Sequence, residues 1–445
     1  MSDSTLNTTQ RKAGEVIHRL ASSKVLPFIL LAAVLLITYF RDPRYFTSPR
    51  MWAEEGTRHF AFSYHNPWFQ ALFEPQVGYL NFWTNFATVL ATIPPLELAP
   101  LVTTLMALIA QTIPVALILW SKSPLWDNWP RKMLGAAVVL FVPLTQELWL
   151  NSVNDYPYFA TAAFLLLIEE TPTGTTRRWV YRGLLLLAGL TGLHSVFLIP
   201  FFILAALWER QPERWIQTAV LMACAVLHLY FIATFRDNAS IGERFAFLGA
   251  ASLGNILLSQ TFNIFLFGLD NAQVMGQELY QLAINNLDQF QRIGRTALVG
   301  LGLLLVWFSW NLPWKLRILF LGSFATLLVL PSMFTGISDK YWLVATGLHQ
   351  RLFLSPNIIL GWMLLLGIQF TQGKGWQCRF RNITSVACAL LLGSAIFWGI
   401  TYFDDHTRNV ERWPDWKTEV QMWEQDPTYL LQIDPPGWVV ELKQP

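Results

Sequence analysis

The chain has 445 residues, of which 53% are hydrophobic and only 13% are charged, and it contains 32 Phe and 21 Trp. Soluble domains carry roughly twice this share of charge, so the composition excludes an ordinary soluble protein and indicates a polytopic membrane protein. The formal net charge of +2 favours neither a nucleic-acid partner nor an acidic tail.

The N-terminal residues 1–24 are polar and include four basic residues, Arg11, Lys12, Arg19 and Lys24. The positive-inside rule predicts that they form a cytoplasmic N-terminus. The first apolar run, 25–40, lacks a small-residue cleavage site, so we expect it to remain as the first span.

A long loop, 41–97, follows and is predicted to lie on the outer face. Its aromatic segment 78–93 has sixteen residues, which as a helix would reach roughly 24 Å, short of the ~30 Å hydrocarbon core. If this segment crossed, the basic linkers around Arg131 and Arg177 would fall outside, against the positive-inside rule. We therefore expect 78–93 to lie flat on the membrane surface.

The rest of the chain alternates between apolar runs and short polar linkers. Two short runs meet near His194 as a predicted hairpin, and 253–268 is predicted to be re-entrant. The predicted fold is all-α, a bundle of about eleven membrane segments. The predicted runs are 98–120, 133–149, 157–168, 183–193, 195–208, 213–235, 296–310, 318–332, 354–370 and 384–402.

We divide the chain into a catalytic module, 25–240, a C-terminal membrane module, 241–402, and a small outer tail, 403–445. The catalytic module includes the outer loops 41–97 and 150–156. The three cysteines, Cys224, Cys378 and Cys388, lack the paired spacing of a zinc or disulfide framework, so we expect them to serve in packing.

Glu54 and Glu55 lie in the first outer loop and are the first candidates for chemistry. Adjacent side chains cannot point the same way, so one is expected to face a cavity while the other makes a supporting contact. Apolar surroundings raise a carboxyl pKa, whereas Arg58 or His59 nearby would hold it ionised, as a general base requires. The alternative is a solvated pair of loop glutamates.

Asp155 lies in the second outer loop, on the side predicted for Glu54. It could orient an acceptor or assist the base, or it could cap the next helix, with Pro157 in the first turn. Four residues of the predicted outer loops are expected to line the acceptor cavity: Tyr79, Asn154, Tyr156 and His349.

Basic side chains at the outer face could bind a phosphate. The candidates are Arg351, His194, Lys340 and Arg244. His194 could equally be a polar plug at a helix break, and Arg351 could simply reach the membrane surface. Asp404, Asp405 and His406 lack a spaced third ligand, so no metal site and no cofactor are predicted.

These features together resemble the GT-C superfamily of polytopic membrane glycosyltransferases. The resemblance rests on Ala53-Glu54-Glu55-Gly56, on Val77-Gly78-Tyr79-Leu80-Asn81-Phe82-Trp83, on Asn154-Asp155-Tyr156 and on the break at Leu193-His194. It covers roughly the first 240 residues. The family usually has an Asp in the first loop, whereas this chain has Glu at both positions, so the identity of the base stays open.

The resemblance implies transfer of a sugar from a polyprenyl-phosphate donor, with inversion, to an O-antigen, glycolipid or protein acceptor. A glutamate would be the general base, and basic groups would meet the charge of the leaving phosphate. It also implies a bacterial inner-membrane enzyme with a periplasmic active site, most similar to transferases that modify lipopolysaccharide O-antigen or glycolipids.

Two other classes remain open. An O-antigen polymerase or ligase would have arginine-rich outer loops, whereas here acidic residues dominate. A transporter or flippase for lipid-linked saccharides would show inverted repeats and charged residues at the membrane midplane. The sequence shows neither feature.

Overall fold

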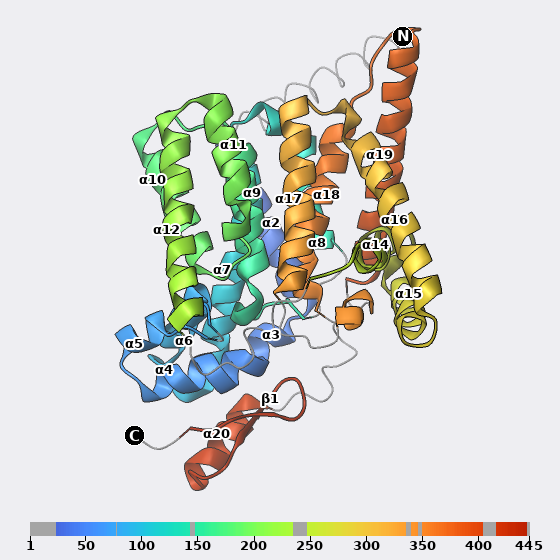
Figure 1. The fold of residues 1–445 in the computed structure, drawn as a ribbon. Coiled ribbons are helices and arrows are strands. Elements are labelled where there is room, and N and C mark those ends of the chain that lie inside the picture. The colour runs from blue at the N-terminus through green and yellow to red at the C-terminus, as the bar shows by residue number, and fades with distance from the viewer. Residues whose placement is uncertain are drawn as a thin grey trace, which may run out of the picture.

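The computed structural model describes residues 24–76, 78–142, 147–234, 247–334, 340–345, 349–403 and 415–442. Arg244 and the Asp404-Asp405-His406 segment lie outside these ranges. The described residues form a helical bundle with one small antiparallel sheet beneath it (Figure 1). The predicted all-α class is therefore confirmed for the bundle, and the sheet is an addition to it.

Six helical stretches are long and apolar enough to cross a bilayer, which suggests a multi-pass membrane protein. They are Leu96–Leu119, made of η2 (Leu96–Leu98) and α7 (Ala99–Leu119), then Pro212–Thr234 (α12), Ala250–Asn285 (α14, η6 and α15), Leu287–Asn311, made of α16 (Leu287–Phe308) and η7, and finally Trp314–Met333 (α17) and Trp376–Thr401 (α19). The predicted count of about eleven spans is wrong for the described residues.

The other predicted spans fold as shorter helices, which explains the error. Thirteen residues of α-helix reach about 20 Å, less than the ~30 Å core. Every residue of α9 and of α18 is buried, so they are apolar on all sides because other helices enclose them. The short helices are α2 (Leu26–Arg41), α8 (Trp129–Phe141), α9 (Tyr156–Ile168), α10 (Thr175–Leu190), η5 (Val196–Leu198) with α11 (Ile199–Glu209), and α18 (Leu354–Gly367).

The predicted re-entrant run 253–268 forms α14 (Ala250–Leu257), the π-helix η6 (Leu258–Asn263) and the start of α15 (Ile264–Asn285). The helix breaks at Gly268, whose φ of 80° and ψ of −179° are not helical. A Cβ on this glycine would lie 2.7 Å from the Trp398 ring, so both the backbone angle and the packing require glycine there.

One end of the bundle carries a layer of short helices, and we call it the site end (Figure 1). Its α6 has ten residues, or about 15 Å, too short to cross, in agreement with the prediction that 78–93 does not span. The layer comprises α3 (Arg44–Thr47), the π-helix η1 (Glu55–Phe60), α4 (Ala61–His65), α5 (Trp68–Phe73) and α6 (Phe82–Ala91).

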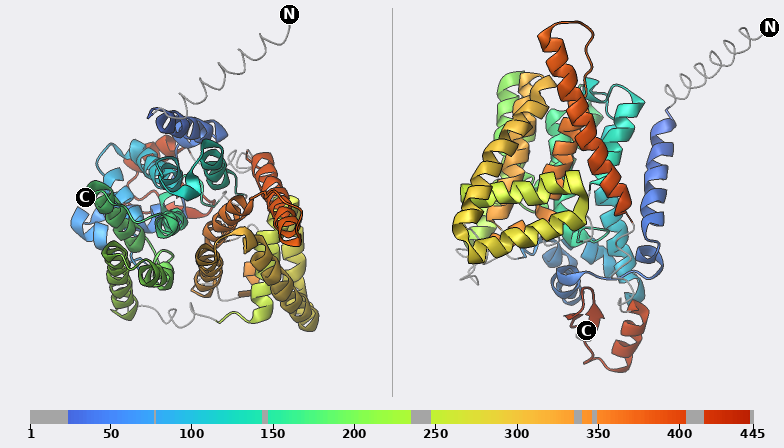
Figure 2. Two further views of the ribbon diagram at one scale, coloured as in Figure 1. Left: turned by 90° about the horizontal axis from the view of Figure 1, so that it is seen from above. Right: turned by 90° about the vertical axis from the view of Figure 1, so that its right-hand side faces the viewer.

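The C-terminal segment 415–442 packs against the site end (Figures 1 and 2). It consists of α20 (Trp416–Gln425) and the hairpin of β1 (Leu431–Ile433) and β2 (Trp438–Val440), in which Gln432 is opposite Val439. The Trp416 indole donates to the Leu96 carbonyl at 2.8 Å. The apolar side chains of segment 415–442 share a buried cluster with Met51 and Phe60.

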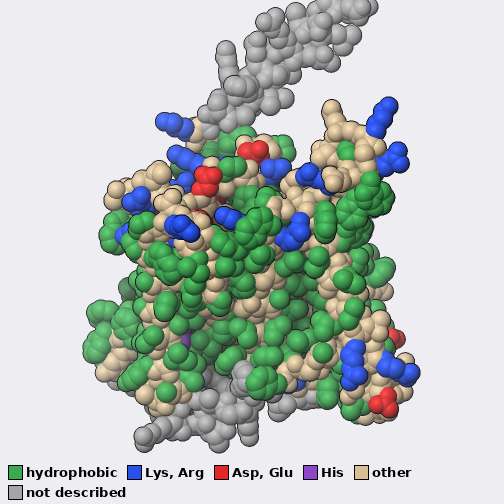
Figure 3. Space-filling view, turned by 45° about the horizontal axis from the view of Figure 1, so that its top comes forward, with side chains coloured by type: hydrophobic (Ala, Val, Ile, Leu, Met, Phe, Trp, Pro, Cys, Tyr) green, Lys and Arg blue, Asp and Glu red, His purple; other side chains and the backbone are tan. Residues whose placement is uncertain are grey.

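The opposite end of the bundle, which we call the basic end, gathers lysine and arginine side chains (Figure 3). The helices that begin there carry them in or near their first turns: Arg131, Lys132, Arg177, Arg178, Arg182, Arg214, Lys315, Arg317, Arg379 and Arg381. Short 3₁₀ turns complete the structure: η3 (Pro124–Trp126), η4 (Ser152–Asn154), η7 (Ser309–Asn311), η8 (Lys340–Val344) and η9 (Gln350–Leu352).

Candidate active site

The two glutamates lie at the start of the π-helix η1. Glu54 is its N-terminal flanking residue, and the helix runs from Glu55 to Phe60. Glu54 and His59 both line the narrow pocket described below, whereas Glu55 does not.

Glu55 faces into the protein and is 1% exposed. Its Oε1 accepts from the Ser152 backbone N–H at 2.8 Å and from the Ser152 hydroxyl at 2.6 Å. Its Oε2 accepts from the Trp52 N–H at 3.2 Å. Burial raises the pKa of Glu55, although these hydrogen bonds oppose the rise. Glu55 thus makes the supporting contact that the sequence predicted for one of the pair.

The C-terminal hairpin holds the residues that come just before Glu54 in the chain. Asp434 forms a buried ion pair with Arg50, whose guanidinium also donates to the Tyr45 hydroxyl at 2.9 Å. The Asp434 carbonyl accepts from the Ala53 N–H at 2.6 Å, and Ala53 has a positive φ of 35°. The residue before Glu54 is therefore held in an uncommon backbone conformation by a segment some 380 positions away.

Gly56 allows the hairpin to pack directly on η1. A Cβ at this position would lie 2.7 Å from Ile433 Cδ1 and 2.9 Å from Val440 Cγ2. A larger residue here would have to displace these side chains, so glycine permits the close approach of the two segments.

The second predicted outer loop packs onto the first turn of α6. The Asn81 amide donates to the Val153 carbonyl at 3.1 Å, and the Thr84 hydroxyl donates to the Ser152 carbonyl at 2.8 Å. These hydrogen bonds and the Glu55 contacts hold the first and second predicted outer loops against each other, although they are far apart in sequence.

A narrow pocket lies between these loops, with a volume of about 90 Å³. Sites for drug-sized ligands measure roughly 300–1,000 Å³, so this pocket is of a size to hold one reacting group. Its lining is mostly polar and consists of Glu54, Arg58, His59, Gln76, Tyr79, Asn81, Val153, Asn154, Tyr156 and Arg351.

Two guanidinium groups share this pocket with Glu54. Arg351 is 31% exposed and forms an ion pair through Nη1 with Glu147. Burial alone would lower the pKa of Arg351, but Glu147, Tyr156 and Glu54 raise it above its usual value, so the group is cationic. Arg58 is exposed at the pocket. The pocket therefore combines one carboxylate with two fixed positive charges.

Five of the predicted site residues line the pocket: Glu54, Tyr79, Asn154, Tyr156 and Arg351. Asp155 does not. It is fully buried, accepts from Gln111 Nε2 at 3.2 Å, and has its pKa raised well above the usual value by burial and by the Glu55 charge. It occupies the N-cap position of α9, but its side chain makes no capping hydrogen bond.

His194 is buried behind the pocket with its ring 4.5 Å from that of Tyr156. Burial and the Arg351 charge lower the pKa of His194 to about 3. The ring is therefore neutral and brings no positive charge to a phosphate. Two other predicted phosphate or cavity residues, His349 and Lys340, do not line the pocket, and the Lys340 ammonium lies 3.5 Å from the Met333 carbonyl.

Sequence reasoning placed His59 near the base only as a charge that would keep it ionised, and that role is wrong. Burial lowers the pKa of His59 to about 4, so its ring is neutral. Gln76, Asn81 and Val153 were not singled out as pocket residues. Asn81 stood in the quoted Gly78–Trp83 motif, but no local pattern marked the other two.

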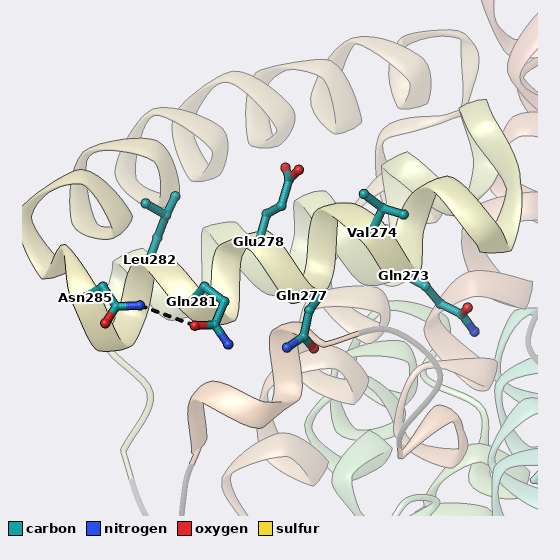
Figure 4. Close-up of a pocket in the computed structure, with 7 residues that line it drawn as sticks. All are labelled: Gln273, Val274, Gln277, Glu278, Gln281, Leu282 and Asn285. Atoms are coloured by element: carbon teal, nitrogen blue, oxygen red, sulfur yellow. Dashed lines mark hydrogen bonds between the residues drawn. The ribbon is translucent and has the colours of Figure 1, made fainter.

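Two wider grooves, each of about 860 Å³, lie on the outside of the bundle. All residues of the first come from α15, with Gln273, Gln277, Gln281 and Asn285 along one side (Figure 4). The second is lined almost entirely by α16. Neither combines a carboxylate with fixed positive charges in an enclosed space, so we place the site in the narrow pocket.

Comparison with models of known protein families, with curated proteins and with solved structures found no match. The fold and the pocket define a helical protein, with six long apolar helices that suggest several membrane crossings, and a polar carboxylate pocket at one end of the bundle.

Proposed function

We propose that this chain is a membrane glycosyltransferase that moves a sugar from a polyprenyl-phosphate donor to an acceptor hydroxyl, with Glu54 as the general base. One observation carries the proposal. Glu54 lines a narrow, mostly polar pocket together with the cationic side chains of Arg58 and Arg351.

This combination suits an inverting displacement with a phosphate leaving group. Glu54 takes the proton of the acceptor hydroxyl as its oxygen attacks the anomeric carbon, and the bond to the phosphate oxygen breaks with its electron pair. Phosphate is already a stable anion, so it needs positive charge and no proton donor. Arg351 and Arg58 supply that charge, and Arg351 offers a fork suited to phosphate oxygens.

The distribution of charge supports an extracytoplasmic pocket. Lysine and arginine gather at the basic end, opposite the short helices that hold the pocket (Figures 1 and 3). The positive-inside rule places such an end in the cytoplasm. The pocket then opens on the far side of the membrane, where lipid-linked sugars and extracytoplasmic acceptors are available.

Purified wild-type protein, incubated with a panel of polyprenyl-phosphate sugars and extracted acceptor, tests the proposal. Glu54→Gln should lose at least 10²-fold in turnover, the usual contribution of a general base, while its melting temperature stays unchanged. Glu97→Gln makes the same chemical change on η2, outside the pocket, and should behave like the wild type.

A folded Glu54→Gln variant with normal turnover would refute the assignment of the base. A wild type that transfers no sugar from any donor, yet moves a labelled lipid-linked saccharide across vesicles, would favour the transporter reading instead.

A further inference from the structure

His59 has a defined tautomer. Its Nδ1 lies 2.6 Å from Asn85 Oδ1. The orientation of the Asn85 amide is set, because its Nδ2 donates to the Leu72 carbonyl at 3.2 Å and to the Glu74 carbonyl at 2.9 Å. An amide oxygen only accepts, so His59 Nδ1 carries the proton, and Nε2 of the neutral ring is a hydrogen-bond acceptor.

The other ring nitrogen of His59, Nε2, is the one left to meet a ligand. His59 as a residue is only 4% exposed, yet it lines the pocket. Nε2 has no hydrogen-bond partner among the described residues, and it is not fully buried. An acceptor that is not fully buried therefore belongs to a residue that lines the same pocket as Glu54.

We propose that His59 Nε2 accepts a hydrogen bond from a second hydroxyl of the sugar acceptor while Glu54 accepts from the attacking hydroxyl. The inference rests on the proposed function and narrows its substrate class. Two acceptor groups in one narrow pocket fit a carbohydrate with neighbouring hydroxyls, whereas a serine or threonine side chain satisfies only one of them.

The electrostatic surroundings agree with this role. Burial lowers the pKa of His59, the Asn85 hydrogen bond opposes that change, and the nearby Arg58 charge lowers the pKa further, to about 4. At neutral pH the ring therefore keeps its lone pair on Nε2 available to a hydroxyl donor.

Two substitutions separate the two edges of the ring. In His59→Asn, the amide nitrogen can replace Nδ1 and keep the Asn85 contact, but nothing replaces Nε2. In His59→Gln, the longer side chain can return an acceptor to the Nε2 position. With a methyl hexopyranoside as acceptor, His59→Asn should raise the acceptor KM about 3–10-fold and leave the donor KM unchanged, as expected for one lost hydrogen bond. His59→Gln should recover part of this loss.

Monodeoxy derivatives of the same glycoside supply a measurement that needs no variant. The derivative that lacks the hydroxyl bound by His59 should have a KM about 3–10-fold higher than the parent glycoside with the wild type. His59→Asn should show the same KM for this derivative and for the parent glycoside, because the variant has already lost that hydrogen bond. A serine peptide should be a poor acceptor for the wild type.

The outcomes distinguish this inference from the proposed function. If the wild type transfers sugar and Glu54→Gln abolishes transfer, but the wild type uses the serine peptide as well as the glycoside or accepts every monodeoxy derivative equally, the inference is overturned and the function stands. An unchanged acceptor KM in folded His59→Asn has the same meaning. A wild type inert towards all donors overturns both.

Discussion

Glu55→Gln separates the supporting glutamate from the proposed base. A glutamine can keep its amide oxygen towards the two Ser152 donors, but its amide nitrogen then faces the Trp52 N–H, which Glu55 Oε2 accepts at 3.2 Å. One hydrogen bond is lost and two buried donors oppose each other, which costs about 1–3 kcal/mol. Burial raises the pKa of Glu55, so removing its charge offsets part of the cost, and we expect a loss of about 1–2 kcal/mol.

The assay compares melting temperature and initial transfer rate for Glu54→Gln and Glu55→Gln in the same detergent. Glu55→Gln should melt earlier and keep measurable turnover at a temperature where it is folded. Glu54→Gln should melt like the wild type and lose turnover. Ser152→Ala removes one donor to Glu55 and should resemble Glu55→Gln. The reverse pattern, a stable but inert Glu55→Gln beside an active Glu54→Gln, would refute the assignment.

Three further predictions follow from the same contacts. Asp434→Asn leaves the buried Arg50 charge without its ionic partner and should weaken the docking of 415–442 by roughly 3 kcal/mol. Backbone amides of 415–442 should then exchange hydrogen faster, whereas the control Glu424→Gln, at an exposed position, should leave exchange unchanged. Unchanged exchange in Asp434→Asn would show that the Arg50–Asp434 ion pair does not hold this segment in place. Folding lowers the pKa of His59 from 6.5 to about 4, so between these pH values the unfolded chain binds a proton that the folded chain does not. The free energy of unfolding should therefore fall as pH drops from about 6.5 to 4, and His59 contributes at most roughly 3 kcal/mol to this fall. His59→Asn should lose this contribution, and the same pH dependence in the variant and the wild type would contradict a neutral His59 ring. Arg351→Gln should raise the donor KM about 10–100-fold, the range for charged hydrogen bonds, and an unchanged donor KM would remove Arg351 from phosphate binding.

The C-terminal hairpin has a consequence for engineering this chain. It contacts the glutamate loop through Asp434, Ile433 and Val440, and none of these contacts is near in sequence to its partner. Removing 415–442 would expose the apolar cluster around Met51 and Phe60 and release Ala53 from its positive φ. The intact C-terminus is therefore needed in any test of the pocket.

The membrane character of the chain and the position of its candidate chemistry could be predicted from local sequence. Composition alone indicated a membrane protein, because charge is too scarce for a soluble surface. The acidic pair at Glu54 and Glu55 and the Asn154–Tyr156 segment both stood in predicted outer loops of an otherwise apolar chain. The structure brings Glu54, Asn154 and Tyr156 into one pocket.

The number of spans could not be predicted in this way, because hydropathy records apolar character and does not record what covers it. The α9 and α18 segments are apolar because they lie inside the bundle among other helices, and each is too short to cross alone. Their runs resemble spans in sequence although neighbouring helices, rather than lipid, surround them.

The division of roles between Glu54 and Glu55 was decided only by the tertiary structure. Local sequence requires adjacent side chains to diverge but does not say which one turns inward. Ser152 binds Glu55 and the C-terminal hairpin packs on Gly56, while Glu54 and His59 line the pocket. These contacts join segments 97 and more than 370 positions apart, beyond the reach of any periodic pattern along the chain.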